Sequence, residues 1–285
     1  MGARQSGSER AAAVAVAAVF FIGCAAAQST APAPTAEDRA RILQSARAYA
    51  LDYSQTLPDF ICTEVVRRYR DGIDPGTWDL TDTLTVRLSY SGHREDYKLV
   101  LVNNKPSNRS YESLGGSISE GEFGSLLRQV FETQASTTIH FARWDSIGDR
   151  RMAVFGYRVT ADHARYAVNF VLNDQRYSTV AGRRGLVFVE PSSGQVLRIT
   201  SAADGLPADF PVQKLTSTLD YASTAIGDRT FLLPRTADVE MQAGAYQTRN
   251  SIEFLTYHKF DADVDVSFDA GSPGDAGKLP ATKKK

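Results

Sequence analysis

The longest part of the chain, residues 60–260, is a succession of short segments rich in Val, Thr, Tyr and Phe, separated by Gly, Asn, Asp and Pro. Branched and aromatic side chains suit the pleated surface of a β-sheet, whereas Gly, Pro, Asn and Asp favour turns. We expect strands at residues 60–69, 81–90, 94–102, 137–145, 151–160, 164–172, 185–190, 195–201, 213–224, 230–233, 236–242 and 246–260. Short turns join several neighbours, which must then pair antiparallel.

Two helices flank or interrupt this series. The first is expected to begin after Thr35, which can act as its N-cap, and to end at Leu57-Pro58. Its apolar residues recur at helical spacing: Ile42, Leu43, Ala46, Tyr49, Ala50 and Tyr53. The second helix is expected at residues 120–133. The fold class is therefore mainly β with flanking helices (α+β): a curved antiparallel sheet or open half-barrel, with an N-terminal helix and one inserted, lid-like helix.

The inserted helix carries the candidate binding residues. Its large apolar side chains form one stripe, and a helix cannot leave such a stripe in water. Gly115, Gly116, Gly121 and Gly124 precede or interrupt it and can absorb backbone rotation. One hypothesis is a movable lid whose inner face contacts an apolar ligand; the alternative is a permanent part of the core. The ligand-binding residues proposed on the first hypothesis are Phe123, Leu127, Val130 and Phe131.

The N-terminus has the order of basic, apolar and small residues that is typical of a secretory signal peptide. We expect a signal peptide at residues 1–27, a flexible tether at 28–34, one β-rich domain at 35–268 and a disordered tail at 269–285. Cleavage after Ala27 gives a soluble periplasmic or secreted protein. Cleavage before Cys24, with acylation of its thiol, gives instead a lipoprotein that associates peripherally with a membrane.

Composition excludes one class of partner and offers no disulfide. The formal net charge is -1, without a basic excess that could bind a nucleic-acid backbone. Without Cys24, the mature chain retains Cys62 alone, which we interpret as a small buried hydrophobe.

No motif predicts catalysis, a metal or a cofactor. The four histidines (His93, His140, His163 and His258) lie on separate segments without metal-ligand spacing. Ser117 lies in a glycine-rich loop but lacks the second glycine of a nucleophile elbow. Asp261, Asp263 and Asp265 alternate as the solvated face of a strand would. The sequence therefore predicts no catalytic residues, no metal site and no cofactor.

Two stretches carry a family resemblance. The segment RGLVFVEPSSGQVLRI (residues 184–199), followed by IGDRTFLLP (226–234), together with the order of helices and strands, resembles the bacterial outer-membrane lipoprotein carrier family. The resemblance implies an open half-barrel whose concave side holds acyl chains beneath helices. The stretches LPDFICTEVVRRY (57–69) and GHREDYKLVLV (92–102) are more similar to exported bacterial proteins of unknown function.

The sequence thus leads to three functional hypotheses. The first is an exported, non-enzymatic protein that binds a lipid or another acylated, apolar ligand in the cell envelope. The second is an envelope protein-interaction or structural module, whose groove is filled by its own side chains. The third is a hydrolase with an unrecognised site.

Overall fold

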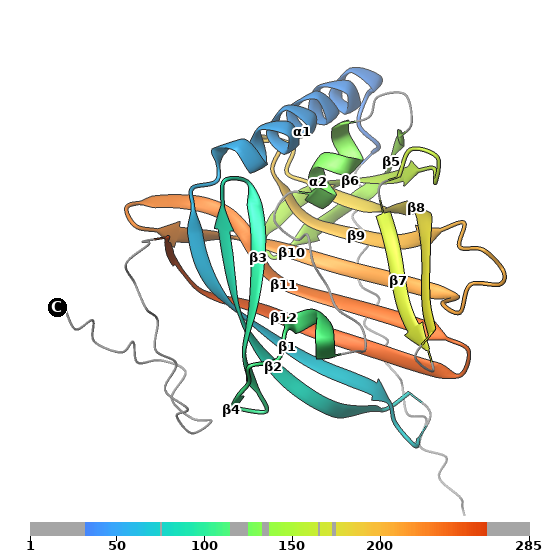
Figure 1. Cartoon of the computed structure of the whole chain (residues 1–285). Coiled ribbons are helices and arrows are strands. Elements are labelled where there is room, and N and C mark those ends of the chain that lie inside the picture. Colours follow the sequence, from blue (N-terminus) through green and yellow to red (C-terminus); the bar gives the residue numbers. More distant parts are fainter. Residues whose placement is uncertain are drawn as a thin grey trace, which may run out of the picture. The chain divides into compact units, whose positions relative to one another are not determined.

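The computed structural model of the 285-residue chain describes residues 32–74, 76–114, 125–132, 137–164, 166–172 and 175–260 (Figure 1). All of them belong to one compact unit, Ala31–Lys285. The segments expected as signal peptide (1–27) and tail (269–285) lie outside the described residues. Of the expected tether (28–34), only residues 32–34 are described.

A curved, unclosed antiparallel sheet makes up most of this unit (Figure 1). Its strands are β1 (Phe60–Asp71), β2 (Trp78–Ser91), β3 (Arg94–Val102), β4 (Lys105–Pro106), β5 (Thr137–Ile147), β6 (Arg150–Val159), β7 (Tyr166–Leu172), β8 (Gln175–Val189), β9 (Val196–Asp204), β10 (Lys214–Ile226), β11 (Arg229–Ala243) and β12 (Tyr246–Lys259). They follow the order β4-β3-β2-β1-β12-β11-β10-β9-β8-β6-β5, with β7 paired to β8.

The first and last strands in the sequence, β1 and β12, are neighbours in the sheet. β1 pairs with β2 on one side and with β12 on the other, so that Val66 lies between Leu84 and Ile252. All three side chains are at most 1% exposed. The pairing joins the early strands to the late ones and makes the succession of hairpins into one sheet.

Helix α1 (Ala36–Thr56) begins and ends where the sequence predicts. The amide of Asp38 donates a 3.1 Å hydrogen bond to the hydroxyl oxygen of Thr35, which satisfies one of the free donors in the first turn. At the other end Leu57 is extended, as expected for a residue that precedes proline.

The buried side of α1 contacts the inner face of the sheet. Ile42, Ala46, Ala50 and Tyr53 are 0–3% exposed and belong to the main core cluster, which also contains residues of strands on both sides of β1. The turn between β8 and β9 packs closely on this helix, since a Cβ on Gly194 would lie 2.6 Å from the backbone carbon of Ser45. The positive φ of Gly194 (+75°) also favours glycine there.

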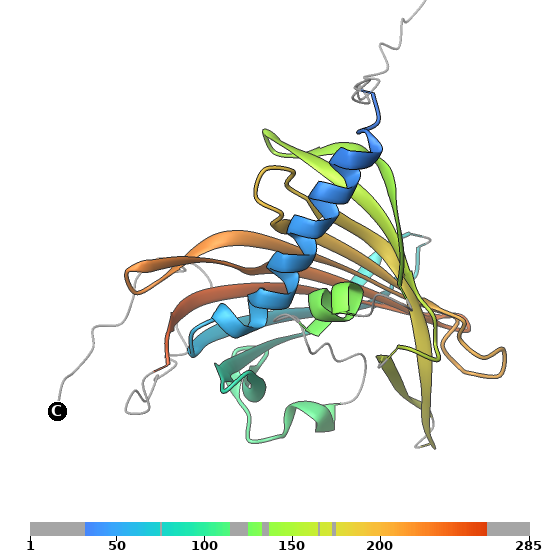
Figure 2. The same ribbon diagram turned by 90° about the horizontal axis from the view of Figure 1, so that it is seen from above.

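Two short helices complete the fold: the 3₁₀ helix η1 (Tyr111–Leu114) and helix α2 (Ser125–Glu132). Figure 2 shows α1 crossing the strands, with α2 beside it. The helix expected at residues 120–133 is observed over Ser125–Glu132, and residues 120–124 and 133 lie outside the described part. The expected fold class, a curved antiparallel sheet with an N-terminal and an inserted helix, is confirmed.

Two strand predictions were wrong. The strands expected at 230–233 and 236–242 form the single strand β11, because a bulge accommodates Pro234: Tyr221 pairs with Pro234 and Asp220 with Thr236, which leaves Arg235 as the extra residue. The strand expected at 185–190 begins ten residues earlier, at Gln175. Its first part pairs with β7 and its second part with β6 and β9.

Candidate functional site

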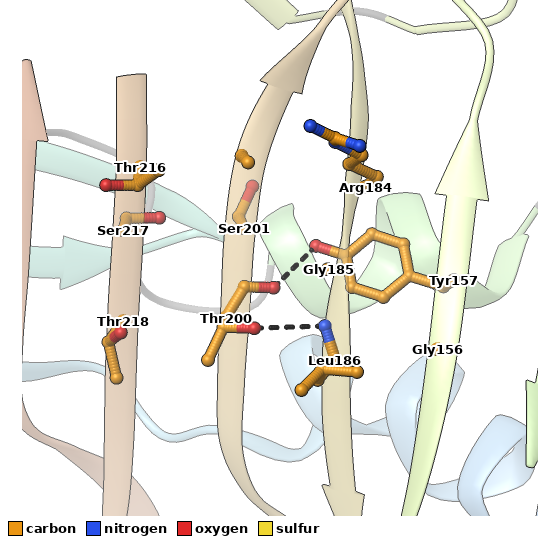
Figure 3. Close-up of a pocket in the computed structure, with 11 residues that line it drawn as sticks. Gly156, Tyr157, Arg184, Gly185, Leu186, Thr200, Ser201, Thr216, Ser217 and Thr218 are labelled. Carbon is orange, nitrogen blue, oxygen red and sulfur yellow. Dashed lines mark hydrogen bonds between the residues drawn. The ribbon is translucent and has the colours of Figure 1, made fainter. Parts of the chain in front are cut away.

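A depression of about 510 Å³ lies over the middle of β6, β8, β9 and β10 (Figure 3). Its lining is rich in hydroxyl groups and glycine: Gly156, Tyr157, Arg184, Gly185, Leu186, Thr200, Ser201, Ala202, Thr216, Ser217 and Thr218. Neither a carboxylate nor a histidine or cysteine lines it. The lining therefore supplies hydroxyl groups that can form hydrogen bonds with a ligand. The ring of His140, the partner of Gly156 on β5, lies next to this lining.

The strand register assigns these side chains to two faces. Tyr157, Gly185, Ser201 and Ser217 are aligned across the four strands, and they share a face with the buried Leu219 of the main core. The neighbouring rows point to the opposite, outer face. These outer rows are Gly156-Leu186-Thr200-Thr218 and Arg184-Ala202-Thr216.

Side chains bond to the backbone at the centre of the depression. The hydroxyl of Tyr157 donates to the carbonyl oxygen of Thr200 (3.0 Å), and the amide of Leu186 donates to Oγ1 of Thr200 (3.0 Å) (Figure 3). Leu186 and Thr200 are direct partners in the β8–β9 ladder. The carbonyl of Thr200 and the amide of Leu186 thus each have a side chain as hydrogen-bond partner.

Glycine is required at position 185 for this arrangement. A Cβ placed on Gly185 would lie 1.9 Å from the carbonyl oxygen of Thr200 and 3.0 Å from the Tyr157 ring. No larger residue fits unless the strands move apart. Gly185 therefore determines how closely β8 and β9 approach below the depression.

The predicted binding residues lie elsewhere, on α2. Leu127 and Val130 are fully buried and Phe131 is 1% exposed, all in the main core cluster, while Phe123 lies outside the described residues. These three residues belong to the same core cluster as the buried residues of α1. In addition, Nε of Arg47 on α1 donates a 3.1 Å hydrogen bond to the carbonyl oxygen of Phe131. None of them lines the depression on β6–β10.

Aromatic side chains fill the inner face near the end of α1. Tyr53 meets Tyr221 edge to face, with ring centroids 6.1 Å apart, and Phe60 stacks on Tyr90 at 5.2 Å. Burial raises the pKa of Tyr53 and of Tyr257 well above the usual value of 10.0. These phenols are therefore neutral and act as packing groups.

The remaining candidates of the sequence do not converge on a site. In the described ranges no three His, Cys, Asp or Glu side chains are close enough together to hold a metal ion. Cys62 is fully buried, as expected, and forms no disulfide with any residue that the structure describes. Cys24, Ser117, Asp261, Asp263 and Asp265 lie outside the described residues.

Sequence reasoning did not find the depression. The sequence predicts no role for Tyr157, for Arg184 or for the Thr-Ser-Thr run at 216–218. The sequence feature that could have indicated the depression is the hydroxyl-rich run on β10, which departs from the apolar alternation of the neighbouring strands. One further structural finding concerns membranes: in the part of the chain that the structure describes, no helix has the length and apolar character needed to cross one.

Known proteins resemble this chain only at a distance. No family model matches the sequence, and no curated protein matches it. Three solved structures are similar in fold. A LolA superfamily protein from Nitrosomonas europaea is 10% identical, with a TM-score of 0.30 over 80% of this chain and 95% of that one. A DUF1329 family protein from Desulfovibrio piger is 11% identical, with a TM-score of 0.35 over 78% of this chain and 95% of that one.

The third is a domain described as an outer-membrane lipoprotein-sorting protein, from Vibrio parahaemolyticus. It is 11% identical, with a TM-score of 0.34 over 78% of this chain and 93% of that one. All three similarities are weak, at 10–11% identity and TM-scores of 0.30–0.35.

Proposed function

We propose that this protein is an exported, non-enzymatic binding protein whose inner sheet face takes a lipid or another acylated, apolar ligand beneath helix α2. One observation carries the proposal: α2 places a fully apolar side, Leu127, Val130 and Phe131, against the inner face of a curved sheet that remains open at its edges. An acyl chain could occupy the surface that this side of the helix now covers.

The packing of α2 supports a cover that moves as a unit. The described turns of α2 are too few to be stable by themselves in water, so they depend on the surfaces against which they pack. It lies against α1 and β6, and the hydrogen bond from Arg47 to Phe131 holds its last turn. If α2 moves away from the sheet, large apolar side chains are exposed on both surfaces, and an apolar ligand would stabilise that state.

The rest of the proposal follows from the sequence and from the lining of the depression. Residues 1–27 have the pattern of a signal peptide, which directs the chain to the periplasm or the outside of the cell. The residues that line the depression provide hydrogen-bonding groups, which suits a binding role.

The first experiment looks for the natural ligand. Protein purified without detergent from its own envelope is analysed by native mass spectrometry and, after solvent extraction, by lipid analysis. We expect a co-purified lipid or acylated molecule in stoichiometric amount. A protein free of such molecules, which in addition binds no fluorescent fatty-acyl probe, would contradict the proposal.

The second experiment separates a movable α2 from a permanent core. Leu127→Ala and Phe131→Ala are compared with Leu255→Ala, a leucine that is 44% exposed on β12. If α2 moves as a unit, both α2 variants bind the acyl probe more weakly and lose less than about 2 kcal/mol of global unfolding free energy. If α2 is permanent core, each loses about 3–5 kcal/mol, the usual cost of truncating a buried large side chain.

The aromatic packing near α1 favours a second candidate, an envelope interaction module whose groove is filled by its own side chains. Phe60, Tyr53 and Tyr90 are 0–3% exposed and occupy part of the inner face. In such a module α2 would be permanent core, and the protein would co-purify with a protein partner and not with a lipid. The two experiments above distinguish the candidates.

A further inference from the structure

Arg184, on the outer face of β8, has no acidic partner among the described residues. Its neighbours are neutralised: Arg158 pairs with Asp204, Arg198 with Asp220, and Arg143 with Asp145. Arg184 is exposed and forms neither an ion pair nor a hydrogen bond with the described part of the chain. One unpaired guanidinium thus lies at the edge of the depression (Figure 3).

The strand register places the charge of Arg184 where it is unfavourable as long as no anion is bound beside it. Arg184 on β8 lies directly opposite Arg158 on β6, on the same face of the sheet. Like charges in directly opposed positions destabilise a sheet. Asp204 bonds to Arg158 at 2.5 Å and so compensates one of the two charges. An anion bound at Arg184 would compensate the other.

Hydroxyl groups surround the place where such an anion would lie. Arg184, Ala202 and Thr216 are aligned across β8, β9 and β10, and Thr200 and Thr218 stand in the next outer row. Ala202 offers only a methyl group between Arg184 and Thr216. Since neighbouring strands are about 4.8 Å apart, Arg184 and Thr216 are roughly 10 Å apart at the backbone, a gap that an arginine side chain and a small anion can fill together.

The three threonines have hydrogens to donate. The hydroxyl oxygen of Thr200 accepts from the amide of Leu186, which leaves its own O–H for a ligand. Thr216 and Thr218 form no side-chain hydrogen bond with any residue that the structure describes, and both are half-buried. All three hydroxyls are therefore available to donate to a ligand on the outer face.

We propose that Arg184, Thr200, Thr216 and Thr218 form a binding site for a tetrahedral oxyanion, of the phosphate or phosphomonoester class. Arg184 and the three threonines stand at neighbouring outer positions of β8, β9 and β10, and such a set of donors suits an anion with three or more oxygens better than a carboxylate, which has two. The guanidinium offers the planar pair of donors that binds phosphate oxygens in bidentate fashion. This site lies on the outer face and does not depend on the acyl-binding site proposed beneath α2.

The test uses inorganic phosphate as the probe and the full chain in phosphate-free buffer at low ionic strength. Titration is followed by calorimetry and by ³¹P NMR. We expect saturable binding, which Arg184→Gln weakens about 10- to 100-fold, as expected for the loss of charged hydrogen bonds. Thr216→Val should weaken it by about 2- to 10-fold, the range for a neutral hydrogen bond.

The matched control is Arg176→Gln, which removes the same charge from an exposed position of the same strand. It should leave phosphate binding unchanged. Arg184→Lys retains the charge without the planar fork and should bind with intermediate affinity. Circular dichroism melts of each variant check that the fold is intact.

A second arm distinguishes a free anion from a lipid headgroup. Sedimentation is measured with phosphatidylcholine vesicles with and without phosphatidic acid, whose headgroup is a phosphomonoester. Binding to inorganic phosphate identifies a site for free anions, and binding only to phosphatidic acid vesicles identifies a headgroup site; either must be lost in Arg184→Gln. If neither probe binds, or if Arg184→Gln and Arg176→Gln behave alike, the site does not exist.

Discussion

Arg47 and Phe131 lie 84 positions apart in the sequence, yet Nε of Arg47 donates a 3.1 Å hydrogen bond to the carbonyl oxygen of Phe131. The bond connects the middle of α1 with the last turn of α2, where carbonyl groups have no partner within the helix. Apolar side chains of both helices, among them Ala46 and Val130, belong to the same core cluster.

Arg47→Met should loosen α2 more than it weakens the whole fold. The substitution keeps most of the apolar stem but removes a charged donor, at a cost of about 1–2 kcal/mol. We expect faster hydrogen exchange in the α2 segment and little change in the central strands. Arg39→Met, at an exposed position of α1, is the control. Equal exchange in both variants would show that the bond does not hold α2.

Gly185→Ala should disrupt the contact between β8 and β9. The added Cβ would lie 1.9 Å from the carbonyl oxygen of Thr200, so the backbone itself would have to move. We expect the unfolding free energy to fall by about 3 kcal/mol, the upper part of the range for overpacking. Ser217→Ala, on the same row of β10, should change it by less than about 0.5 kcal/mol. Chemical denaturation measures both, and a neutral Gly185→Ala would contradict the close approach.

The ion pair between Arg68 and Asp82 should matter more than an exposed pair. Arg68 contacts both carboxylate oxygens of Asp82, at 2.7 and 2.6 Å, and the two side chains are only 12% and 15% exposed. Asp82→Asn leaves the guanidinium partly buried without its counter-charge, which should cost about 2–3 kcal/mol. The exposed Arg128–Glu132 pair provides the comparison: Glu132→Gln should cost no more than about 0.5 kcal/mol. Similar losses from the two variants would show that burial adds nothing to the first pair.

Local structure was predictable from the sequence because its causes are local. The strand expected at 94–102 is observed as Arg94–Val102, and it follows a turn in which Gly92 and His93 both have positive φ. The N-cap at Thr35 and the end of α1 before Pro58 depend in the same way on neighbouring residues. Propensity and turn geometry are sufficient for such features.

The site was not predictable, because it depends on register between distant strands. Tyr157, Gly185 and Thr200 meet only because β6, β8 and β9 pair as they do. Alternation along one strand indicates which side chains share a face, but not which strand lies beside it. For the same reason the pairing of β1 with β12 could not be deduced from either segment alone.

Alkaline pH should destabilise the fold through its buried tyrosines. Burial raises the pKa values of Tyr49, Tyr53 and Tyr257 above 10.0, the usual value, which is the value expected in the unfolded chain. A group whose folded pKa is raised contributes its full stability below the unfolded pKa and loses it as the pH rises toward the folded pKa. Stability should therefore stay level up to about pH 9.5 and fall above pH 10, by at most about 1.4 kcal/mol per pH unit for each tyrosine. Denaturation curves between pH 8 and 11.5, with phenolate absorbance at 295 nm, test this; ionisation of these tyrosines in the folded protein near pH 10 would contradict it.

Tyr53→Phe should stabilise the protein at neutral pH. The hydroxyl of Tyr53 is completely buried and has no hydrogen-bond partner among the described residues, so folding removes it from water without replacing its bonds. Such a group costs about 1–3 kcal/mol, whereas the ring contributes through its packing against Tyr221 and Tyr49. Phenylalanine keeps the ring, and we expect the unfolding free energy to rise by about 1 kcal/mol.

Tyr257→Phe is the matched control for this prediction, because its hydroxyl donates a 2.6 Å hydrogen bond to the carbonyl oxygen of Pro234. Tyr53 belongs to the main core cluster and Tyr257 packs against it, and both substitutions remove one oxygen. Loss of a satisfied hydrogen bond should lower the unfolding free energy by about 1 kcal/mol, with opposite sign to Tyr53→Phe. Urea denaturation at pH 7 measures both variants. If both are destabilised to the same extent, a partner for the Tyr53 hydroxyl must exist in the folded protein, and its burial cannot be the source of the expected gain.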